Sequence, residues 1–216
     1  MPYSSREILG MTPVVPVIVI TDLGQAVPLA NALIEGGIKV LEVTLRTPEG
    51  LQAITQIKEQ VEGAVVGAGT IVNESDLEQA LEAGSEFIIT PGLTDSLLRK
   101  GSDCGVPFMP GIATVSEMMR CLDHGLDTLK FFPAEANGGA PALKAISGPF
   151  PDVRFCPTGG INQENLKSYL SLPSVLSVGG SWMVPQALIE KGDWAGITQL
   201  AAEASELVAA IREKLK

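Results

Sequence analysis

The sequence predicts an α/β fold of the (β/α)8 type, a single TIM barrel in which eight parallel strands alternate with helices. Short apolar segments bounded by glycine and proline recur eight times, with starts about 20 to 26 residues apart, the length of one strand, one helix and two loops. Several segments are hydrophobic almost throughout, as expected of parallel strands covered on both faces. The glycine-rich turn typical of a doubly wound open sheet does not follow the first segment, where the chain reads Thr21-Asp22-Leu23-Gly24.

Each predicted strand is followed by a helical pattern, the first of which stops at Gly36-Gly37. A short N-terminal helix, capped by Ser4 or Ser5 and ending at Gly10, is expected to close the floor of the barrel, and a last amphipathic helix spans 195–215. Because no linker or low-complexity tract interrupts the series, residues 1–216 are expected to form one domain. The eight predicted strands are 14–20, 39–45, 64–70, 87–91, 107–112, 128–133, 154–158 and 175–178.

The composition favours a soluble globular protein and excludes several partners. The 216 residues are 45% hydrophobic and 19% charged, and the net charge of -10 disfavours nucleic-acid binding or adhesion to an anionic membrane. Three widely spaced cysteines and an N-terminus without an apolar leader indicate the cytoplasm, with no secretion or membrane insertion. One histidine, His124, lies at a predicted helix end, so neither histidine acid–base chemistry nor a metal site is expected.

Lys130 lies inside the apolar segment 127–134, which is short enough to be a buried strand. Burying an ammonium group costs several kcal/mol. A lysine in this position therefore pairs with a carboxylate, loses its proton and becomes a nucleophile, or lies at the end of the strand with its amine in solvent.

The alternation of side chains along the strands places three charged residues inside the barrel. In strand 39–45 it puts Glu42, and Arg46 just beyond the strand, on the interior face. The same count in strand 128–133 makes Lys130 interior. Glu42 and Arg46 alone would be compatible with a structural ion pair, but together with an interior lysine they indicate a catalytic group. A neutral lysine attacks a carbonyl and forms a Schiff base, which withdraws electrons from the neighbouring carbon.

Glycines follow the seventh and eighth strands, in Thr158-Gly159-Gly160 and in Gly180-Ser181. The loops after strands seven and eight, with amides directed from a helix N-terminus, form the recurring phosphate site of barrel enzymes. A purely conformational role for these glycines is the alternative. Cys156 has no histidine beside it, so core packing is its expected role.

These residues lie in segments that resemble the 2-keto-3-deoxy-6-phosphogluconate (KDPG) aldolase and 4-hydroxy-2-oxoglutarate (KHG) aldolase family, and the resemblance covers 14–185. The segments that carry it are Leu41-Glu42-Val43-Thr44-Leu45-Arg46-Thr47, Val66-Gly67-Ala68-Gly69-Thr70, Lys130-Phe131-Phe132-Pro133-Ala134-Glu135, Cys156-Pro157-Thr158-Gly159-Gly160-Ile161 and Gly179-Gly180-Ser181-Trp182.

The resemblance implies a class I aldolase, with Lys130 as the Schiff-base lysine and Glu42 as the general acid/base. It also implies that Arg46 and Thr70 bind the pyruvate carboxylate. The other implied contacts are Pro91, Phe132 and Thr158 in the substrate pocket and Gly159, Gly160, Gly180 and Ser181 at the phosphate.

The implied reaction cleaves KDPG, a phosphorylated keto acid, to pyruvate and glyceraldehyde 3-phosphate, and cleaves KHG to pyruvate and glyoxylate. The family needs no cofactor and commonly forms homotrimers. An aldolase for the C4-epimeric 2-keto-3-deoxy-6-phosphogalactonate and a non-catalytic barrel that binds phospho-sugar acids are the alternatives.

Overall fold

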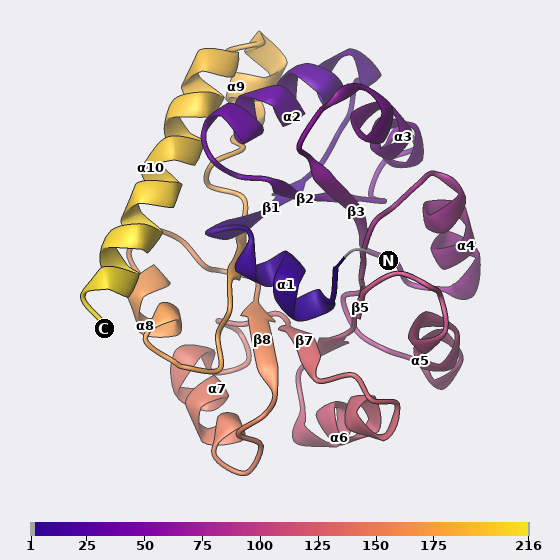
Figure 1. Ribbon diagram of the computed structural model, residues 1–216, viewed down its shortest axis with the longest axis vertical. Coiled ribbons are helices and arrows are strands. Elements are labelled where there is room, and N and C mark those ends of the chain that lie inside the picture. Colours follow the sequence, from indigo (N-terminus) through magenta and orange to yellow (C-terminus); the bar gives the residue numbers. More distant parts are fainter. Residues whose placement is uncertain (1–2, 216) are drawn as a thin grey trace.

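The fold, described for residues 3–215 by a computed structural model, consists of parallel strands surrounded by helices (Figure 1). The strands are β1 (Val14–Ile18), β2 (Val40–Thr44), β3 (Val65–Gly69), β4 (Ile88–Ile89), β5 (Phe108–Met109), β6 (Gly111–Ile112), β7 (Thr128–Phe131), β8 (Arg154–Pro157) and β9 (Val178–Gly180). The helices are α1 (Ser5–Gly10), η1 (Leu23–Gln25), α2 (Ala26–Glu35), α3 (Gly50–Gln60), α4 (Glu74–Glu82), α5 (Asp95–Ser102), α6 (Val115–Asp123), α7 (Gly139–Ser147), α8 (Leu166–Leu170), α9 (Gln186–Lys191) and α10 (Trp194–Glu213).

The strands form two parallel sheets. The larger has six strands in the order β5-β4-β3-β2-β1-β9, and the smaller has the order β6-β7-β8. Only Pro110 separates β5 from β6, and single bridges join Phe155 to Val175 and Thr158 to Gly179 across the gap between β8 and β9. The α/β class and the parallel pairing agree with the sequence prediction.

The strands of the structure are shorter than predicted at one or both ends, and two of the predictions differ in more than that. The predicted strand 107–112 is broken at Pro110, which has no N–H to donate to a ladder. The eighth strand was predicted at 175–178, but β9 begins at Val178 and continues through Gly179 and Gly180. Glycine is normally unfavourable in a strand, yet a Cβ on Gly179 would lie 2.8 Å from Thr158 Cγ2, so close packing requires glycine there.

Alternation along the strands divides the buried apolar side chains into two clusters, as the sequence predicts. Leu41 and Leu129 belong to the large cluster under the helices. Val40 and Cys156 belong to the smaller cluster between the strands. Glu42 is two residues after Val40, and Lys130 directly follows Leu129. Both charged side chains therefore face the interior with the smaller cluster.

The two ends of the chain pack as predicted, with small shifts in the bounds. Ser4 caps α1 in a capping box with Glu7, and Ile8 and Leu9 of this helix insert into the interior cluster; α1 lies over the centre in Figure 1. The last helix was predicted at 195–215 and runs from Trp194 to Glu213, packed against α2. Among residues 3–215, no helix combines the length and the apolar character needed to cross a membrane.

Candidate active site

Lys130 and Glu42 meet in the interior between the two sheets. Lys130 is in the middle of β7 and Glu42 in the middle of β2. The Lys130 Nζ atom donates a hydrogen bond of 3.0 Å to Glu42 Oε1, and the two residues are 5% and 1% exposed. Of the readings that the sequence left open for Lys130, an amine in solvent at the strand end is therefore wrong.

The glycine at the end of β3 makes room for this ion pair. Gly69 pairs with Thr44 in the ladder between β2 and β3. A Cβ on Gly69 would lie 2.6 Å from Glu42 Cγ and 2.8 Å from Glu42 Cδ, and closer still to Oε1. Any larger residue would push the carboxylate away from Lys130, so the glycine is needed for space.

An aromatic ring lies beside the amine. The Phe132 ring, two residues along the chain from Lys130, has its centroid 5.3 Å from Lys130 Nζ. This is within the range of a cation–π contact. Phe132 also lines the neighbouring cavity, so it connects the buried amine to the space where a substrate would bind.

Arg46 does not pair with Glu42, so the structural ion pair considered from the sequence is absent from residues 3–215. Arg46 is exposed, and its Nε donates to Thr70 Oγ1 at 3.3 Å. Thr70 has φ of 62°, the left-handed region that non-glycine residues rarely occupy. This conformation places the hydroxyl beside the guanidinium, which leaves other N–H groups of Arg46 available to a carboxylate.

A cavity of about 320 Å³ is lined by most of the predicted binding residues. Lys130 and Glu42 do not line it, and Phe132 connects it to the amine of Lys130. Pro91, which is half-buried, and Thr70 are not among its lining residues. Val17, Ile161 and Gly179 also line the cavity, although the sequence did not predict them as binding residues. Val17 and Ile161 are apolar residues of a strand and a loop, and nothing in the sequence distinguishes them from residues of the core. The cavity is lined by Val17, Arg46, Phe132, Thr158, Gly159, Gly160, Ile161, Gly179, Gly180 and Ser181.

In the loop after β8, three successive carbonyl groups accept hydrogen bonds from residues that do not line this cavity. The Thr158 carbonyl accepts from the Ala134 N–H at 2.8 Å, and the Gly159 carbonyl accepts from the Glu135 N–H at 3.1 Å. The Gly160 carbonyl accepts from the Asn165 side chain at 2.9 Å.

In a trans peptide the carbonyl and the following N–H point in opposite directions. The N–H groups of Gly159, Gly160 and Ile161 therefore point away from these donors, and none of them donates a hydrogen bond within residues 3–215. Gly159 and Gly160 have φ of 102° and 79°. Successive N–H groups in such a turn form a concave anion site.

The sequence prediction assigned part of this site to a helix N-terminus, and the structure corrects that. The helices that follow the glycine loops, α8 and α9, begin only at Leu166 and Gln186 and have 5 and 6 residues. The glycines of both loops precede these helices by several residues. An anion at these loops would therefore meet peptide dipoles within the loops and not a helix end.

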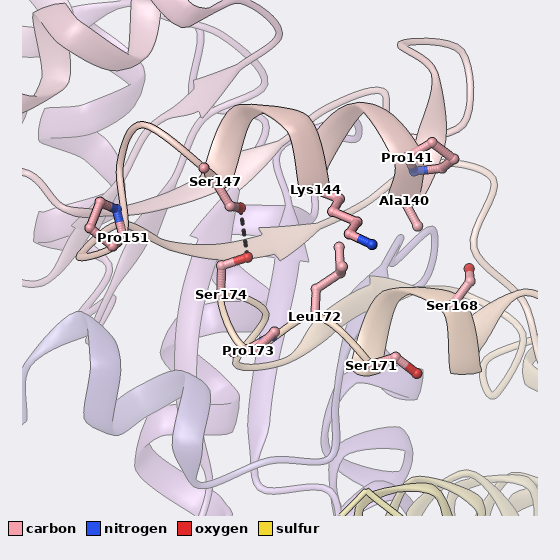
Figure 2. Close-up of a pocket in the computed structure, with 11 residues that line it drawn as sticks. Ala140, Pro141, Lys144, Ser147, Pro151, Ser168, Ser171, Leu172, Pro173 and Ser174 are labelled. Carbon is pink, nitrogen blue, oxygen red and sulfur yellow. Dashed lines mark hydrogen bonds between the residues drawn. The ribbon is translucent and has the colours of Figure 1, made fainter.

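A second, larger hollow lies on the outer surface between α7 and the segment after α8 (Figure 2), with a volume of about 810 Å³. Its serine hydroxyls are satisfied within the protein; Ser147 and Ser174, for example, bond to each other at 2.8 Å. Lys144 is its single charged lining residue. Among residues 3–215, no acid or base lines the groove beside Lys144, whereas Lys130 is paired with the carboxylate of Glu42. The interior pair is therefore the better candidate for catalysis.

The remaining polar candidates are structural. His124 caps the C-terminus of α6, as predicted. Burial, followed by the charge of Glu42, raises the pKa of Cys156 to about 12, so the thiol stays protonated and packs in the interior. Within residues 3–215, no group of three metal-binding side chains is present.

Comparisons with known proteins agree on one family. Residues 6–200 match the family model described as KDPG and KHG aldolase. The KHG/KDPG aldolase of Escherichia coli K12 is 55% identical over 203 residues, which are 94% of this chain and 95% of that protein.

Two solved structures are similar over the same extent. The KDPG aldolase of Legionella pneumophila, with pyruvate captured as a covalent carbinolamine, has a TM-score of 0.92 at 47% identity and covers 95% of this chain and 100% of that one. The enzyme of Zymomonas mobilis ZM4, with 3-phosphoglycerate, has a TM-score of 0.88 at 51% identity and covers 93% and 94%.

Proposed function

The chain belongs to the KDPG and KHG aldolase family, and we propose that it cleaves KDPG to pyruvate and glyceraldehyde 3-phosphate through a Schiff base on Lys130. KHG, which would give pyruvate and glyoxylate, is the proposed second substrate. The buried hydrogen bond between Lys130 and Glu42 carries the proposal. It joins a nucleophile to a proton acceptor in a site next to an anion-binding cavity.

In the proposed reaction, a proton first passes along the 3.0 Å hydrogen bond from Lys130 to Glu42, which leaves a neutral amine and a carboxylic acid. The amine attacks the C2 carbonyl, and Glu42 protonates the oxygen as the carbinolamine forms. Loss of water then gives the protonated imine. No other acid is needed, because one carboxyl group gives and takes the protons in turn.

Carbon–carbon cleavage uses the same two residues. Glu42 removes the proton of the C4 hydroxyl, the C3–C4 bond breaks, and its electron pair moves to the imine of Lys130 as an enamine. Glyceraldehyde 3-phosphate leaves, the enamine is protonated at C3 by Glu42, and water releases pyruvate. The electron-withdrawing imine lowers the barrier, because the electron pair moves to a cationic nitrogen.

Arg46 and Thr70 are the proposed anchors of the pyruvate carboxylate. A guanidinium binds a carboxylate with two parallel hydrogen bonds, which fixes the keto carbon relative to the amine. The 3.3 Å bond between Arg46 and Thr70 supports this role, since it restrains the guanidinium before the substrate arrives. Pro91 is the proposed wall of the same pocket.

The phosphate is proposed to bind the N–H groups of Gly159, Gly160 and Ile161, with further contacts from Gly180 and Ser181. These residues and Thr158 line the same cavity. Binding energy gained at the phosphate, remote from the bond that breaks, orients the substrate in the transition state.

The wider architecture is proposed from the same family. We infer a single domain over residues 1–216 whose two sheets act as one closed (β/α)8 barrel; the bridges from Phe155 to Val175 and from Thr158 to Gly179 support closure. A homotrimer in the cytoplasm, working without a cofactor, completes the proposal.

Trapping with pyruvate and borohydride tests the function directly. Reduction is expected to add one pyruvyl group, and peptide mapping is expected to find it on Lys130. The exposed lysines should stay unmodified, because they lack Arg46 to hold the pyruvate carboxylate. Lys130→Met, a substitution of similar length, is expected to abolish both the adduct and the release of pyruvate from KDPG. Modification of a different lysine, or cleavage that persists in Lys130→Met, would refute the Schiff-base mechanism.

A further inference from the structure

Asn165 lies between the glycine loop after β8 and helix α8, and both ends of its side chain bond back to the loop. Its Oδ1 accepts from the Asn162 N–H at 2.9 Å, and its Nδ2 donates to the Gly160 carbonyl at 2.9 Å. Although Asn165 is the N-cap residue of α8, its side chain makes no capping bond to that helix. The side chain therefore serves the loop and not the helix.

The Gly160 carbonyl differs from the two before it. Those of Thr158 and Gly159 are bonded by backbone N–H groups of the loop after β7, whereas that of Gly160 is bonded by a side chain. Gly160 lacks a Cβ and has φ of 79°, so the orientation of the peptide that follows it depends on this side-chain bond. Without the Asn165 amide, this peptide can rotate and present a carbonyl to the cavity in place of the Ile161 N–H.

A rotation of this kind matters only to a substrate that places a phosphate at this loop. The Ile161 N–H attracts a phosphate oxygen, while a carbonyl oxygen in the same place repels it. Asn165 is not among the residues that line the cavity, so it acts through Gly160.

We propose that Asn165 is a positioning residue that fixes the Gly160–Ile161 peptide with its N–H toward the phosphate, and that it thereby sets the preference for phosphorylated over unphosphorylated keto acids. The inference rests on the proposed function, because it assumes that KDPG and KHG are both substrates. The buried pair of Lys130 and Glu42 is outside its reach, since the side chain of Asn165 bonds only within the loop after β8.

Two variants of Asn165 and one control test the proposal. Asn165→Leu removes both hydrogen bonds at nearly constant size. Asn165→Asp keeps the acceptor for Asn162 but sets a carboxylate oxygen against the Gly160 carbonyl. Gln163→Asp adds the same charge in the same exposed turn, at a side chain that makes no hydrogen bond within residues 3–215.

Both Asn165 variants are expected to raise the KM for KDPG by about 3- to 10-fold, the effect of losing one ordering hydrogen bond, with kcat within about 2-fold. Their kcat/KM for KHG should match wild type. Inorganic phosphate, tested as an inhibitor of KHG cleavage, should bind more weakly by a similar factor. Gln163→Asp should leave the KM for KDPG unchanged or raise it far less.

Three results would overturn the proposal. One is an unchanged KM for KDPG in Asn165→Leu; another is an equal loss on KDPG and KHG, accompanied by a lower Tm, which would make Asn165 a residue for folding alone. The third is a KM for KDPG that rises equally in Asn165→Asp and Gln163→Asp but not in Asn165→Leu. The added negative charge alone would then explain the effect. Failure of the proposed function is distinct, because wild type would then cleave neither substrate and form no adduct with borohydride.

Discussion

The substitution Gly69→Ala tests whether the space beside Glu42 controls catalysis. The added Cβ would lie 2.6 Å from Glu42 Cγ and 2.8 Å from Cδ, whereas ordinary contacts begin at 3.4 Å. Because β2 and β3 are held together by the ladder that includes Thr44 and Gly69, the side chain and not the strands must move. A retreat of about 1 Å stretches the 3.0 Å bond to Lys130 beyond hydrogen-bonding distance.

The expected loss has two parts. Separating a buried carboxylate from its only cation is destabilising by about 3–5 kcal/mol if neither group finds water, so Tm should fall. Misplacing the acid/base group should lower kcat for KDPG by about 10²- to 10⁴-fold. Pyruvate release, followed by coupling to lactate dehydrogenase, measures kcat, and calorimetry measures Tm.

The matched control is Gly10→Ala at the end of α1, where an added Cβ meets nothing within 4 Å. It should leave both kcat and Tm near wild-type values. Should Gly69→Ala retain full kcat, the carboxylate position in the structure would not be the one that catalyses the reaction, and the reasoning would be wrong.

Two further substitutions separate the carbon chemistry from phosphate binding. Glu42→Gln keeps the shape of the site but cannot accept a proton, so kcat for both substrates should fall by about 10²- to 10⁴-fold; a normal kcat would remove Glu42 from the mechanism. Ser181→Asp should raise the KM for KDPG by charge repulsion and spare KHG, which has no phosphate. Equal losses on both substrates would instead indicate a role for Ser181 in folding. Steady-state kinetics on the two substrates measures both outcomes.

The meeting of Lys130 with Glu42 could be predicted from the sequence although 88 residues separate them. Alternation along each strand fixes which face a side chain occupies, and parallel strands bring interior positions to the same central space. The same rule placed Leu41 and Leu129 under the helices, where the structure has them. Such predictions succeed because they depend on a period of two and on burial, both of which are visible in one sequence.

The loops could not be predicted to the same depth. That Arg46 bonds Thr70 and leaves Glu42 to Lys130 depends on the path of the chain after β2 and after β3. The bond from Asn165 to the Gly160 carbonyl depends on a turn between β8 and α8 that no periodicity reveals. Glycines in such loops indicate conformational freedom, but their orientation follows from hydrogen bonds that form only in the folded chain.

The division between strands and loops also separates two parts of the proposed function. Lys130 and Glu42 lie in β7 and β2, where hydrogen bonds to neighbouring strands hold the backbone in place. Catalysis requires such precise positions of the reacting atoms. The proposed phosphate site consists of N–H groups in a loop, and in our proposal the orientation of one of them, that of Ile161, depends on the bond from the Asn165 side chain to the Gly160 carbonyl. Substitutions in this loop can therefore change which keto acid binds without moving the atoms that break the carbon–carbon bond.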